Sequence, residues 1–535
     1  MGGIAYNLPR TGRGAAWQRT SLGDWGSPVQ IRPSRLCETV AIAWVRRLIV
    51  SLPVEPSNAA TDRHAESLSA IGATIDDLVS GPQTDAVVRR DAWEDLGERL
   101  PEVGIGLDAT LSELQERVMP YGNRLSDPGF IGWITAGPST APAAAAAAAN
   151  MLAPQRYGLS AFNLIEELSL EWLAELCGLG DCMKGVYSSG GSTANLVALG
   201  AARQHAFTRA GIDPAADGVD GRPVAVYTST EAHHTVARSA AVLGLGRHAI
   251  RSIAIDENQR MNPDDLERQL NRDLASGVLP VAIVATAGTT NTGAIDPLDE
   301  VGSIANDQGV WFHVDGAYGL VGSLDQRIAL RYQGLQRADS AIVDPHKWLG
   351  APVGIASTFV RDRAILYDAF TQEPADYLDG AFVAEVDAQS TFESLGIPYS
   401  EFGVELSSPS RGIQVWAILK ELGVEGVRHR VRTDNDLATH TAQRAIDNPA
   451  LEALTEPQLS IATFRFTDNR IEDLDAFNHD VLIAVRRESR FIVSSTVVDG
   501  RYAIRPCYIN PRTTVEHVDE FVDAVVSVGK RMLAG

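Results

Sequence analysis

A short run of glycine and hydroxyl residues, SSGGST at positions 188–193, precedes a helical pattern at positions 194–199. Glycine lets a backbone approach an anion closely, and the free N–H groups of a first helical turn point toward that anion. Here Gly191 could make the approach, and the hydroxyls of Ser192 and Thr193 would add donors. The run suits a phosphate group, although Gly/Ser-rich turns are also ordinary helix caps, so the motif alone leaves both interpretations open.

Three residues with charged or reactive side chains each follow an apolar run that is typical of a buried strand. Asp315 could pair with a pyridine nitrogen and keep it protonated, which strengthens such a ring as an electron sink. Lys347 could lose its charge in an enclosed site, which suits imine formation with a carbonyl group. His233 could stack on a flat aromatic ring.

Each of these residues also has an ordinary alternative. Aspartate commonly caps helices, lysine usually points to solvent, and a single loop histidine is more often a surface residue. Their order favours the functional interpretation. The glycine-rich loop comes first, followed by His233, Asp315 and Lys347, and each of the last three stands just after a predicted strand.

The elements that would position these residues follow from the apolar pattern. Helical segments alternate with short apolar runs that predict buried parallel strands, at positions 224–228, 281–286, 310–314 and 340–343. Each run ends in polar residues. In open α/β sheets, ligands bind at the carboxyl ends of the strands. We therefore expect an α/β fold whose chemistry lies at this edge.

The pattern changes after about Arg411. A helix at 413–422 precedes alternating stretches at 459–466 and 491–498, and Asp499-Gly500 is a hairpin signal leading to a strand at 502–509. A last helix is predicted to begin at a capping box formed by Thr513 and Glu516. Together these indicate a smaller α+β domain. We expect four parts: an extension at 1–60, a helical segment at 61–152, a large domain at 153–410 and a small domain at 411–535.

The composition favours a soluble protein. The 535 residues are 45% hydrophobic and 21% charged, with a net charge of −22, which argues against a nucleic-acid partner. The four cysteines are scattered without zinc spacing, so we expect reduced thiols, no metal site and a cytoplasmic location. No run is apolar for the roughly 20 residues that a membrane span needs. Residues 1–60 hold seven Arg against three acidic residues and no sustained periodicity, so we expect a disordered extension.

The order and intervals of these motifs resemble the group II pyridoxal-5′-phosphate (PLP)-dependent decarboxylases of fold type I, a family that includes the aromatic-amino-acid, histidine, glutamate and cysteine-sulfinate decarboxylases. The resemblance runs from about position 65 to the C-terminus. It rests on further stretches as well: FIGW at 130–133, Glu166 with Trp172, ATAGTT at 285–290, GAID at 293–296, HVDGAY at 313–318, and IRPC at 504–507 with Asn510 and Thr513. It implies a PLP-binding large domain with a mixed, mostly parallel sheet, a small C-terminal domain and a helical N-terminal segment.

The resemblance implies a role for each site residue. Lys347 would carry PLP as a Schiff base. Gly191, Ser192 and Thr193 would hold the PLP phosphate, with His346 lying against the cofactor near that phosphate.

The remaining implied contacts concern the ring. His233 would stack on one face and Ala317 would pack on the other, while Asp315 would pair with the ring nitrogen. Asp344 would lie close by, and the turn that begins at Thr289 would face the cofactor.

The resemblance also implies a proton donor, a tyrosine on a loop between the two domains that reaches the neighbouring subunit's site. That interval contains Tyr377 and Tyr399. We favour Tyr399, because its distance in sequence from Arg411 resembles that of the animal aromatic enzymes. The alternative is that Tyr399 only packs at the interface and that Phe402 or water fills the site.

The implied function is decarboxylation of an L-amino acid to its amine by a homodimer with active sites at the interface. The stretch WITA at 133–136 departs from the animal aromatic enzymes and leaves the substrate open. Alternatives are a C–C lyase, an aminotransferase, an aldehyde-forming oxidative decarboxylase, or a non-catalytic binding protein on the same fold. Sphingosine-phosphate lyases lack the HKW of 346–348, and a P-loop nucleotide site would need a Lys-Ser/Thr ending that the glycine loop lacks.

Overall fold

The computed structural model describes residues 64–80, 96, 100–122, 125–152, 161–371 and 396–534. The expected extension at 1–60 therefore lies outside the described residues. The chain divides into two units, Met1–Leu68 and Ser69–Gly535, and the account below concerns the second.

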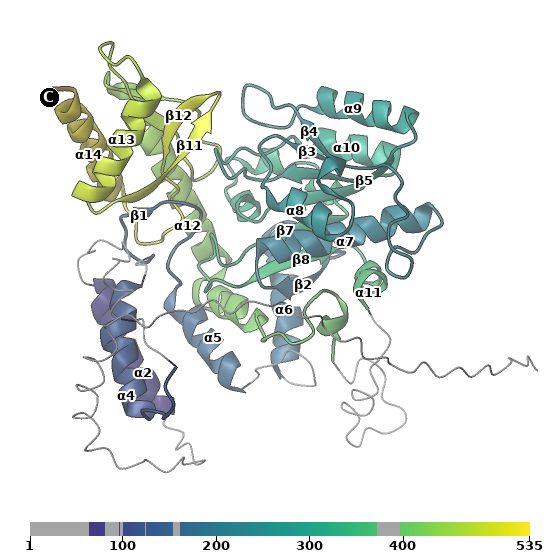
Figure 1. Cartoon of the computed structure of the whole chain (residues 1–535), viewed down its shortest axis with the longest axis horizontal. Helices are drawn as coiled ribbons and strands as arrows, with labels where there is room; N and C mark the ends of the chain where they lie inside the picture. Colours follow the sequence, from purple (N-terminus) through teal and green to yellow (C-terminus); the bar gives the residue numbers. More distant parts are fainter. Residues whose placement is uncertain are drawn as a thin grey trace, which may run out of the picture. The chain divides into compact units, whose positions relative to one another are not determined.

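The second unit contains a seven-stranded sheet with helices packed around it (Figure 1). Its strands are β2 (Lys184–Ser188), β3 (Val224–Ser229), β4 (Ile250–Ile253), β5 (Leu279–Thr286), β6 (Trp311–Asp315), β7 (Ser340–Val343) and β8 (Ala356–Val360). They lie in the order β2-β8-β7-β6-β5-β3-β4. Strand β8 runs antiparallel to both β2 and β7, and the other neighbours are parallel. The expected mixed, mostly parallel sheet is confirmed.

Helices pack against this sheet because its strands are apolar on both faces. They include α6 (Ala161–Leu176), α7 (Gly191–Arg209), α8 (Thr235–Val242), α9 (Pro263–Ala275), α10 (Leu298–Gln308) and α11 (Ala364–Phe370). Helix α7 contacts β2, β5, β6, β7 and β8. Its position across these strands brings its first turn to the edge where the strands end.

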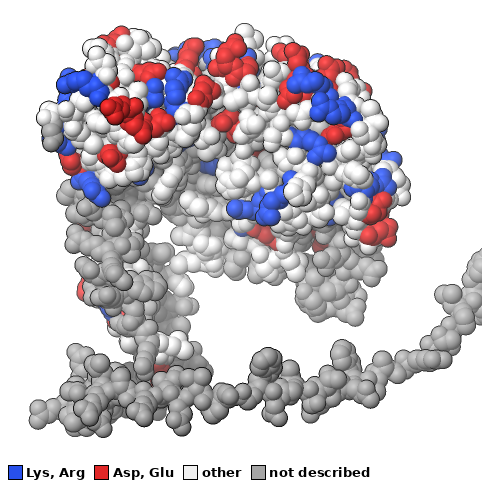
Figure 2. Space-filling view, turned by 45° about the horizontal axis from the view of Figure 1, so that its top comes forward, with Lys and Arg blue, Asp and Glu red and all other residues white. Residues whose placement is uncertain are grey.

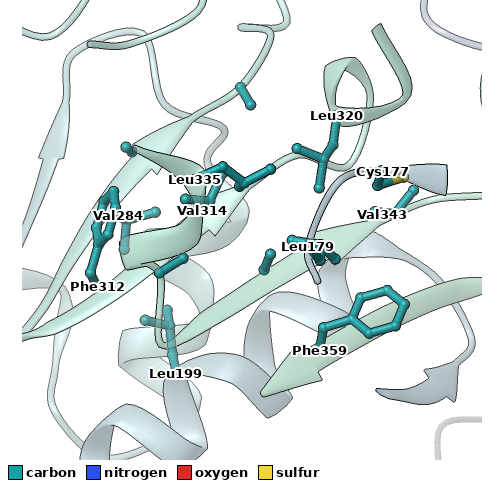
Figure 3. Close-up of a cluster of buried hydrophobic side chains, with 14 of the residues drawn as sticks. Cys177, Leu179, Leu199, Val284, Phe312, Val314, Leu320, Leu335, Val343 and Phe359 are labelled. Atoms are coloured by element: carbon teal, nitrogen blue, oxygen red, sulfur yellow. The ribbon is translucent and has the colours of Figure 1, made fainter. Parts of the chain in front are cut away.

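Most of the core of the large sheet is one large cluster of buried side chains, and a smaller cluster adjoins β7, β8 and α7. Figure 3 shows part of the large cluster, with Val314 and Val343 from neighbouring strands and Leu199 from α7. Cys177 belongs to the same cluster, and burial raises the pKa of its thiol to about 12. This cysteine is therefore an inert core residue.

A second sheet of five strands has its own core cluster. Its order is β1-β11-β12-β10-β9, built from β1 (Phe130–Ile131), β9 (Leu451–Ala453), β10 (Phe464–Phe466), β11 (Ile492–Val498) and β12 (Arg501–Arg505). Helices α12 (Gly412–Asp447), α13 (Leu474–Glu488) and α14 (Val515–Ala534) pack with it. Strand β1 pairs with β11 in parallel. The N-terminal segment thus covers an edge of the C-terminal sheet, which sequence analysis did not foresee.

Two local expectations in this sheet had different outcomes. The hairpin turn is confirmed, since Asp499 and Gly500 both have positive φ, 49° and 75°. The capping box at Thr513 is wrong by one residue. The Thr513 hydroxyl donates to the carbonyl of Pro128 at 2.8 Å, and the Thr514 backbone N–H donates to Nδ1 of His517 at 3.1 Å. Thr513 is used to attach the loop before β1, so its neighbour caps α14.

The described N-terminal segment contains α2 (His64–Ser80), α4 (Leu107–Glu113) and α5 (Thr140–Leu152). Among all described helices, none is long and apolar enough to cross a membrane. Figure 2 shows acidic and basic side chains intermingled over the face that it displays.

Candidate active site

A cavity of about 230 Å³ lies at the ends of strands β3, β5, β6 and β7, beside the first turn of α7. It brings together most of the residues that sequence analysis selected: Gly191, Ser192, His233, Asp315, Ala317, Asp344, His346 and Lys347. A larger hollow, of about 610 Å³, is lined by loops near 256–260, 295–300 and 454–458 and holds none of them. The smaller cavity is therefore the candidate active site.

The glycine-rich loop at 188–193 leads directly into a helix, as its sequence predicts. Helix α7 begins directly at Gly191, after β2 and a two-residue turn. A Cβ atom on Gly191 would lie 2.5 Å from Oδ2 of Asp344, so only glycine fits there. The Thr193 hydroxyl pairs with that of Ser189 at 3.0 Å and steadies the turn, although Thr193 does not line the cavity.

Lys347 and its neighbours form a compact charged group. The Lys347 Nζ atom lies 3.1 Å from Oδ2 of Asp344, and Nε2 of His346 lies 3.8 Å from the same oxygen. The other ring nitrogen of His346, Nδ1, is hydrogen-bonded to the carbonyl of Ile355. Asp344 is buried, and its Oδ1 atom has no hydrogen-bond partner among the residues that the structure describes. One oxygen thus remains available to a group in the cavity.

Asp315 is the last residue of β6, and His233 lies in the loop that follows β3. The Asp315 carboxylate is buried and accepts two hydrogen bonds, from Nδ2 of Asn195 at 3.0 Å and from the backbone N–H of Ala317 at 3.2 Å. Nδ1 of His233 lies 2.8 Å from the Thr235 hydroxyl. Burial lowers the pKa of His233, which favours a neutral ring.

Buried polar atoms without a partner cluster at this edge of the sheet. Four of them stand at or just after the ends of β2, β3, β5 and β7: Ser188 Oγ, Ser229 Oγ, Thr286 Oγ1 and Asp344 Oδ1. Buried polar groups are normally hydrogen-bonded. Of these four residues, Thr286 and Asp344 line the cavity, which indicates a site built for a ligand with polar groups.

Thr289 does not face the cavity directly. Its buried hydroxyl pairs with that of Thr292 at 3.0 Å and accepts from the backbone N–H of Ala294 at 3.1 Å, which closes the turn. The next residue, Thr290, lines the cavity in its place. The turn thus faces the cavity through Thr290, whereas Thr289 stabilises the backbone of the turn.

The expectation for Tyr399 is not supported by its position. Its side chain is 1% exposed and does not line the cavity. The hydroxyl donates to Oε2 of Glu167 at 2.6 Å, and the Arg363 guanidinium lies 5.4 Å from the ring centre. Burial raises the pKa of this phenol. These contacts favour a packing role inside the subunit, and the role of Tyr399 as proton donor stays an untested prediction; Tyr377 lies outside the described residues.

Arg505 connects the stretch at 133–136 to the turn at 289–291. Its guanidinium donates to the carbonyls of Trp133 at 2.8 Å, Thr290 at 2.5 Å and Asn291 at 3.1 Å. Trp133 has a positive φ of 52° and an indole that is 61% exposed. A bulky residue in this conformation is unusual, and such strain is concentrated at functional sites.

Sequence analysis missed five residues that line the cavity: Asn195, Thr235, Thr286, Gly288 and Tyr318. One signal was available for Asn195. It stands four positions after Gly191 in α7, so both lie on one face of the helix. The hydroxyl residues at strand ends and Tyr318 resemble ordinary buried polar or aromatic residues in the sequence.

Comparisons with known proteins agree with this geometry. Residues 95–467 match the model of the pyridoxal-dependent decarboxylase conserved domain. An aromatic-L-amino-acid decarboxylase of Bacillus atrophaeus is 30% identical over 85% of this chain and 94% of its own length. An L-2,4-diaminobutyrate decarboxylase of Rhizobium meliloti is 31% identical over 86% and 89%.

A solved structure gives the same fold. The crystal structure of Oryza sativa TDC with PLP and tryptamine superimposes with a TM-score of 0.79, at 24% identity, and covers 89% of this chain and 99% of that one. The family match spans well over half of the chain and includes every cavity residue named above. The chain belongs to the pyridoxal-dependent decarboxylase family, whose members are carboxy-lyases that use PLP.

Proposed function

We propose that Lys347 holds PLP covalently in the cavity and that the enzyme converts an L-amino acid to the corresponding amine and CO2. The observation that carries this proposal is the position of Lys347. Its Nζ atom lies in the cavity together with the first turn of α7 and the side chains of Asp315 and His233.

The residues present fit the parts of PLP. The backbone N–H groups at the start of α7, with Ser192, suit the phosphate. Asp315 suits the ring nitrogen, and His233 and Ala317 suit the two faces of the ring. The unpartnered Oδ1 of Asp344 and Thr286 Oγ1 offer further polar contacts.

When bound, PLP supplies a conjugated ring that accepts the electron pair released as CO2 leaves the substrate. The protein's part is to hold and orient. Asp315, fixed by two hydrogen bonds, would keep a positive charge on the ring nitrogen. Asp344, 3.1 Å from Lys347, would hold that amine in position for attack on a carbonyl.

The substrate class and the assembly are also proposals. The two relatives above are named for an aromatic amino acid and for 2,4-diaminobutyrate, so both kinds of substrate are candidates. We propose a cytoplasmic homodimer. Helix α4 has no buried residue, and large apolar side chains on the N-terminal helices are exposed, including Ile75, Val79, Leu107 and Leu152. A second copy of the chain would cover such surface.

The test is to load purified protein with PLP, to incubate it with the standard amino acids and 2,4-diaminobutyrate, and to measure CO2 and amine together. We expect one or a few L-amino acids to give the two products in equal amounts without a keto-acid co-substrate. An aldehyde formed with consumption of oxygen would indicate the oxidative variant, and a keto-acid requirement an aminotransferase. Neither product with any amino acid would contradict the proposal.

A further inference from the structure

The side chain of Asn195 contacts three buried groups on different elements. Its Nδ2 atom lies 3.0 Å from Oδ2 of Asp315 and 3.2 Å from the Thr235 hydroxyl, and its Oδ1 atom lies 3.1 Å from Nε2 of His313. A carboxylate oxygen accepts hydrogen bonds, so the amide nitrogen must face Asp315. The amide oxygen then faces His313, which must donate through Nε2.

The hydrogen bonds of His313 with Ser340, and of Ser340 with Trp311, are consistent with Nε2 of His313 as the donor. Burial lowers the pKa of His313 to about 4, so its ring is neutral and carries one proton, on Nε2. Nδ1 therefore accepts from the Ser340 hydroxyl, 2.9 Å away. The Ser340 oxygen in turn accepts from the indole N–H of Trp311 at 2.8 Å, and an indole can only donate.

The same assignment of donors and acceptors extends from Asn195 to Thr235 and His233. The Thr235 hydroxyl accepts from the amide and is free to donate its own proton to Nδ1 of His233, at 2.8 Å. The backbone N–H of Thr235 also points to this nitrogen, at 3.4 Å. Two donors therefore converge on Nδ1, and the proton of a neutral His233 ring lies on Nε2.

We propose that Asn195 is a positioning residue that sets two groups of the cofactor site together. It holds the Asp315 carboxylate directly, and through Thr235 it fixes His233 as the Nε2–H tautomer. His313, with Ser340 and Trp311 behind it, keeps the amide in the required orientation. The proposal rests on the proposed function, because it takes Asp315 and His233 as partners of the PLP ring.

The test measures how tightly the apoenzyme binds PLP and 1-deaza-PLP, an analogue with a carbon in place of the ring nitrogen, by quenching of tryptophan fluorescence. The wild type should prefer PLP by about tenfold or more, because a hydrogen bond to a charged group is worth roughly that factor. In Asn195→Leu the carboxylate loses its side-chain donor, and the preference should fall to about twofold or less.

Variants of Thr235 test the His233 part of the proposal separately from the Asp315 part. Thr235→Val keeps the contact between Asn195 and Asp315, so the preference for PLP should remain. Both cofactors should bind more weakly by a similar factor, because His233 loses its fixed tautomer, and Thr235→Ser should restore the affinity. Equal affinity in Thr235→Val and wild type would contradict the His233 part of the proposal.

Two controls keep the test decisive. Gln204→Leu removes another buried amide of α7, one that contacts Asp213 instead of the cavity, and should leave the preference unchanged. If Asn195→Leu does not fold, His313→Leu should lower the preference while His313→Gln, which retains an N–H donor, should keep it. A wild type without preference would contradict the pairing of Asp315 with PLP. A preference in wild type that persists in the Asn195 or His313→Leu variants would overturn the role of Asn195.

Discussion

The residues of the site act through one another more than through their separate chemistry. Lys347 is oriented by Asp344, and Asp315 by the backbone of Ala317 and the amide of Asn195. Replacement of a single group should therefore alter a specific step and leave the rest of the site in place. Two experiments on single residues, borohydride labelling of Lys347 and replacement of Asp315, separate cofactor binding from turnover.

The covalent attachment can be mapped directly. Protein purified with PLP should be yellow, and borohydride should fix the cofactor to Lys347. Among the described residues that line the cavity, Lys347 is the only lysine. Peptide mapping by mass spectrometry checks the position. Lys184, which pairs with Glu171 away from the cavity, serves as the internal control and should remain unmodified. An adduct on another lysine would remove Lys347 from the proposed role.

The charge of Asp315 should matter for turnover and much less for binding. Asp315→Asn keeps the size of the side chain and an acceptor for Ala317, so PLP should still bind. A neutral amide holds the ring nitrogen's positive charge poorly, and kcat should fall by about a hundredfold or more. Steady-state kinetics with a PLP absorption spectrum checks both parts. A kcat close to wild type would exclude Asp315 from the mechanism.

The residues that sequence analysis found and missed differ in a physical respect. Asp315 and Lys347 stand at the ends of strands that are apolar enough to be recognised, and parallel strands bring their ends to one edge. Asn195 and Thr235 lie inside α7 and at the start of α8, where a polar residue looks like any other. Their role depends on partners 120 and 40 positions away, and spacing alone does not reveal such contacts.

At the scale of elements, what the sequence failed to predict lies mainly where segments meet. Strand β1 is two residues long and takes its form from β11, more than 300 positions away. Propensity carries little information about such a strand. Likewise, the distance in sequence from Arg411 suggested a loop position for Tyr399, whereas its side chain contacts Glu167 of α6 and Arg363, the residue before α11.

The two tyrosines should therefore differ in what they control. Tyr399→Phe should retain amine formation and lose about 1 to 2 kcal/mol of stability, because its hydroxyl bonds a carboxylate in a buried contact. Tyr377→Phe, the matched variant, should retain stability and lose amine formation if it supplies the proton, which general-acid catalysis makes worth roughly 10²–10⁴-fold. Urea unfolding and product analysis distinguish them. Loss of amine in Tyr399→Phe alone would restore the original assignment.

The contact between α12 and the segment after β7 should make stability depend on pH. Burial raises the pKa of Asp434 to about 8, and its Oδ2 atom accepts from the indole N–H of Trp348 at 2.7 Å. The folded state thus holds a proton that the unfolded chain has lost above about pH 4. Stability should fall as pH rises from 4 to 8, by an amount on the order of a few kcal/mol.

Asp434→Asn should remove this fall, because an amide accepts the same hydrogen bond without a charge. Urea midpoints at pH 5 and pH 8 for the wild type and the variant measure the effect. Asp436→Asn, an exposed neighbour in α12, is the control and should keep the wild-type slope. An identical slope in wild type and Asp434→Asn would show that Asp434 does not carry the dependence.

At the scale of the whole molecule, the two sheets are joined by polar contacts at the cofactor site. Arg505 of β12 donates to the carbonyls of Thr290 and Asn291, and the Asn291 side chain bonds both Thr496 of β11 and Glu231 near His233. The small sheet is therefore part of the site's support. The domain boundaries at 153 and 411 remain a proposal, with residues 130–131 assigned to the small sheet by pairing.

The first 58 residues should be dispensable, in contrast to α2, which follows them. The segment is rich in arginine and without periodicity, and the family match begins only at residue 95. Deletion of residues 1–58 should leave PLP content, kcat and the number of subunits measured by light scattering unchanged. Deletion of residues 1–80 is the matched comparison. It removes α2, whose Ala70 carbonyl and Thr74 hydroxyl accept hydrogen bonds from Gln115 at 3.0 and 2.8 Å. It also removes the exposed apolar side chains of Ile75 and Val79, so this longer deletion should weaken the proposed dimer. Loss of the dimer already in the shorter deletion would show that residues 1–58 contribute to assembly, and a dimer that persists in the longer one would exclude α2 from the interface.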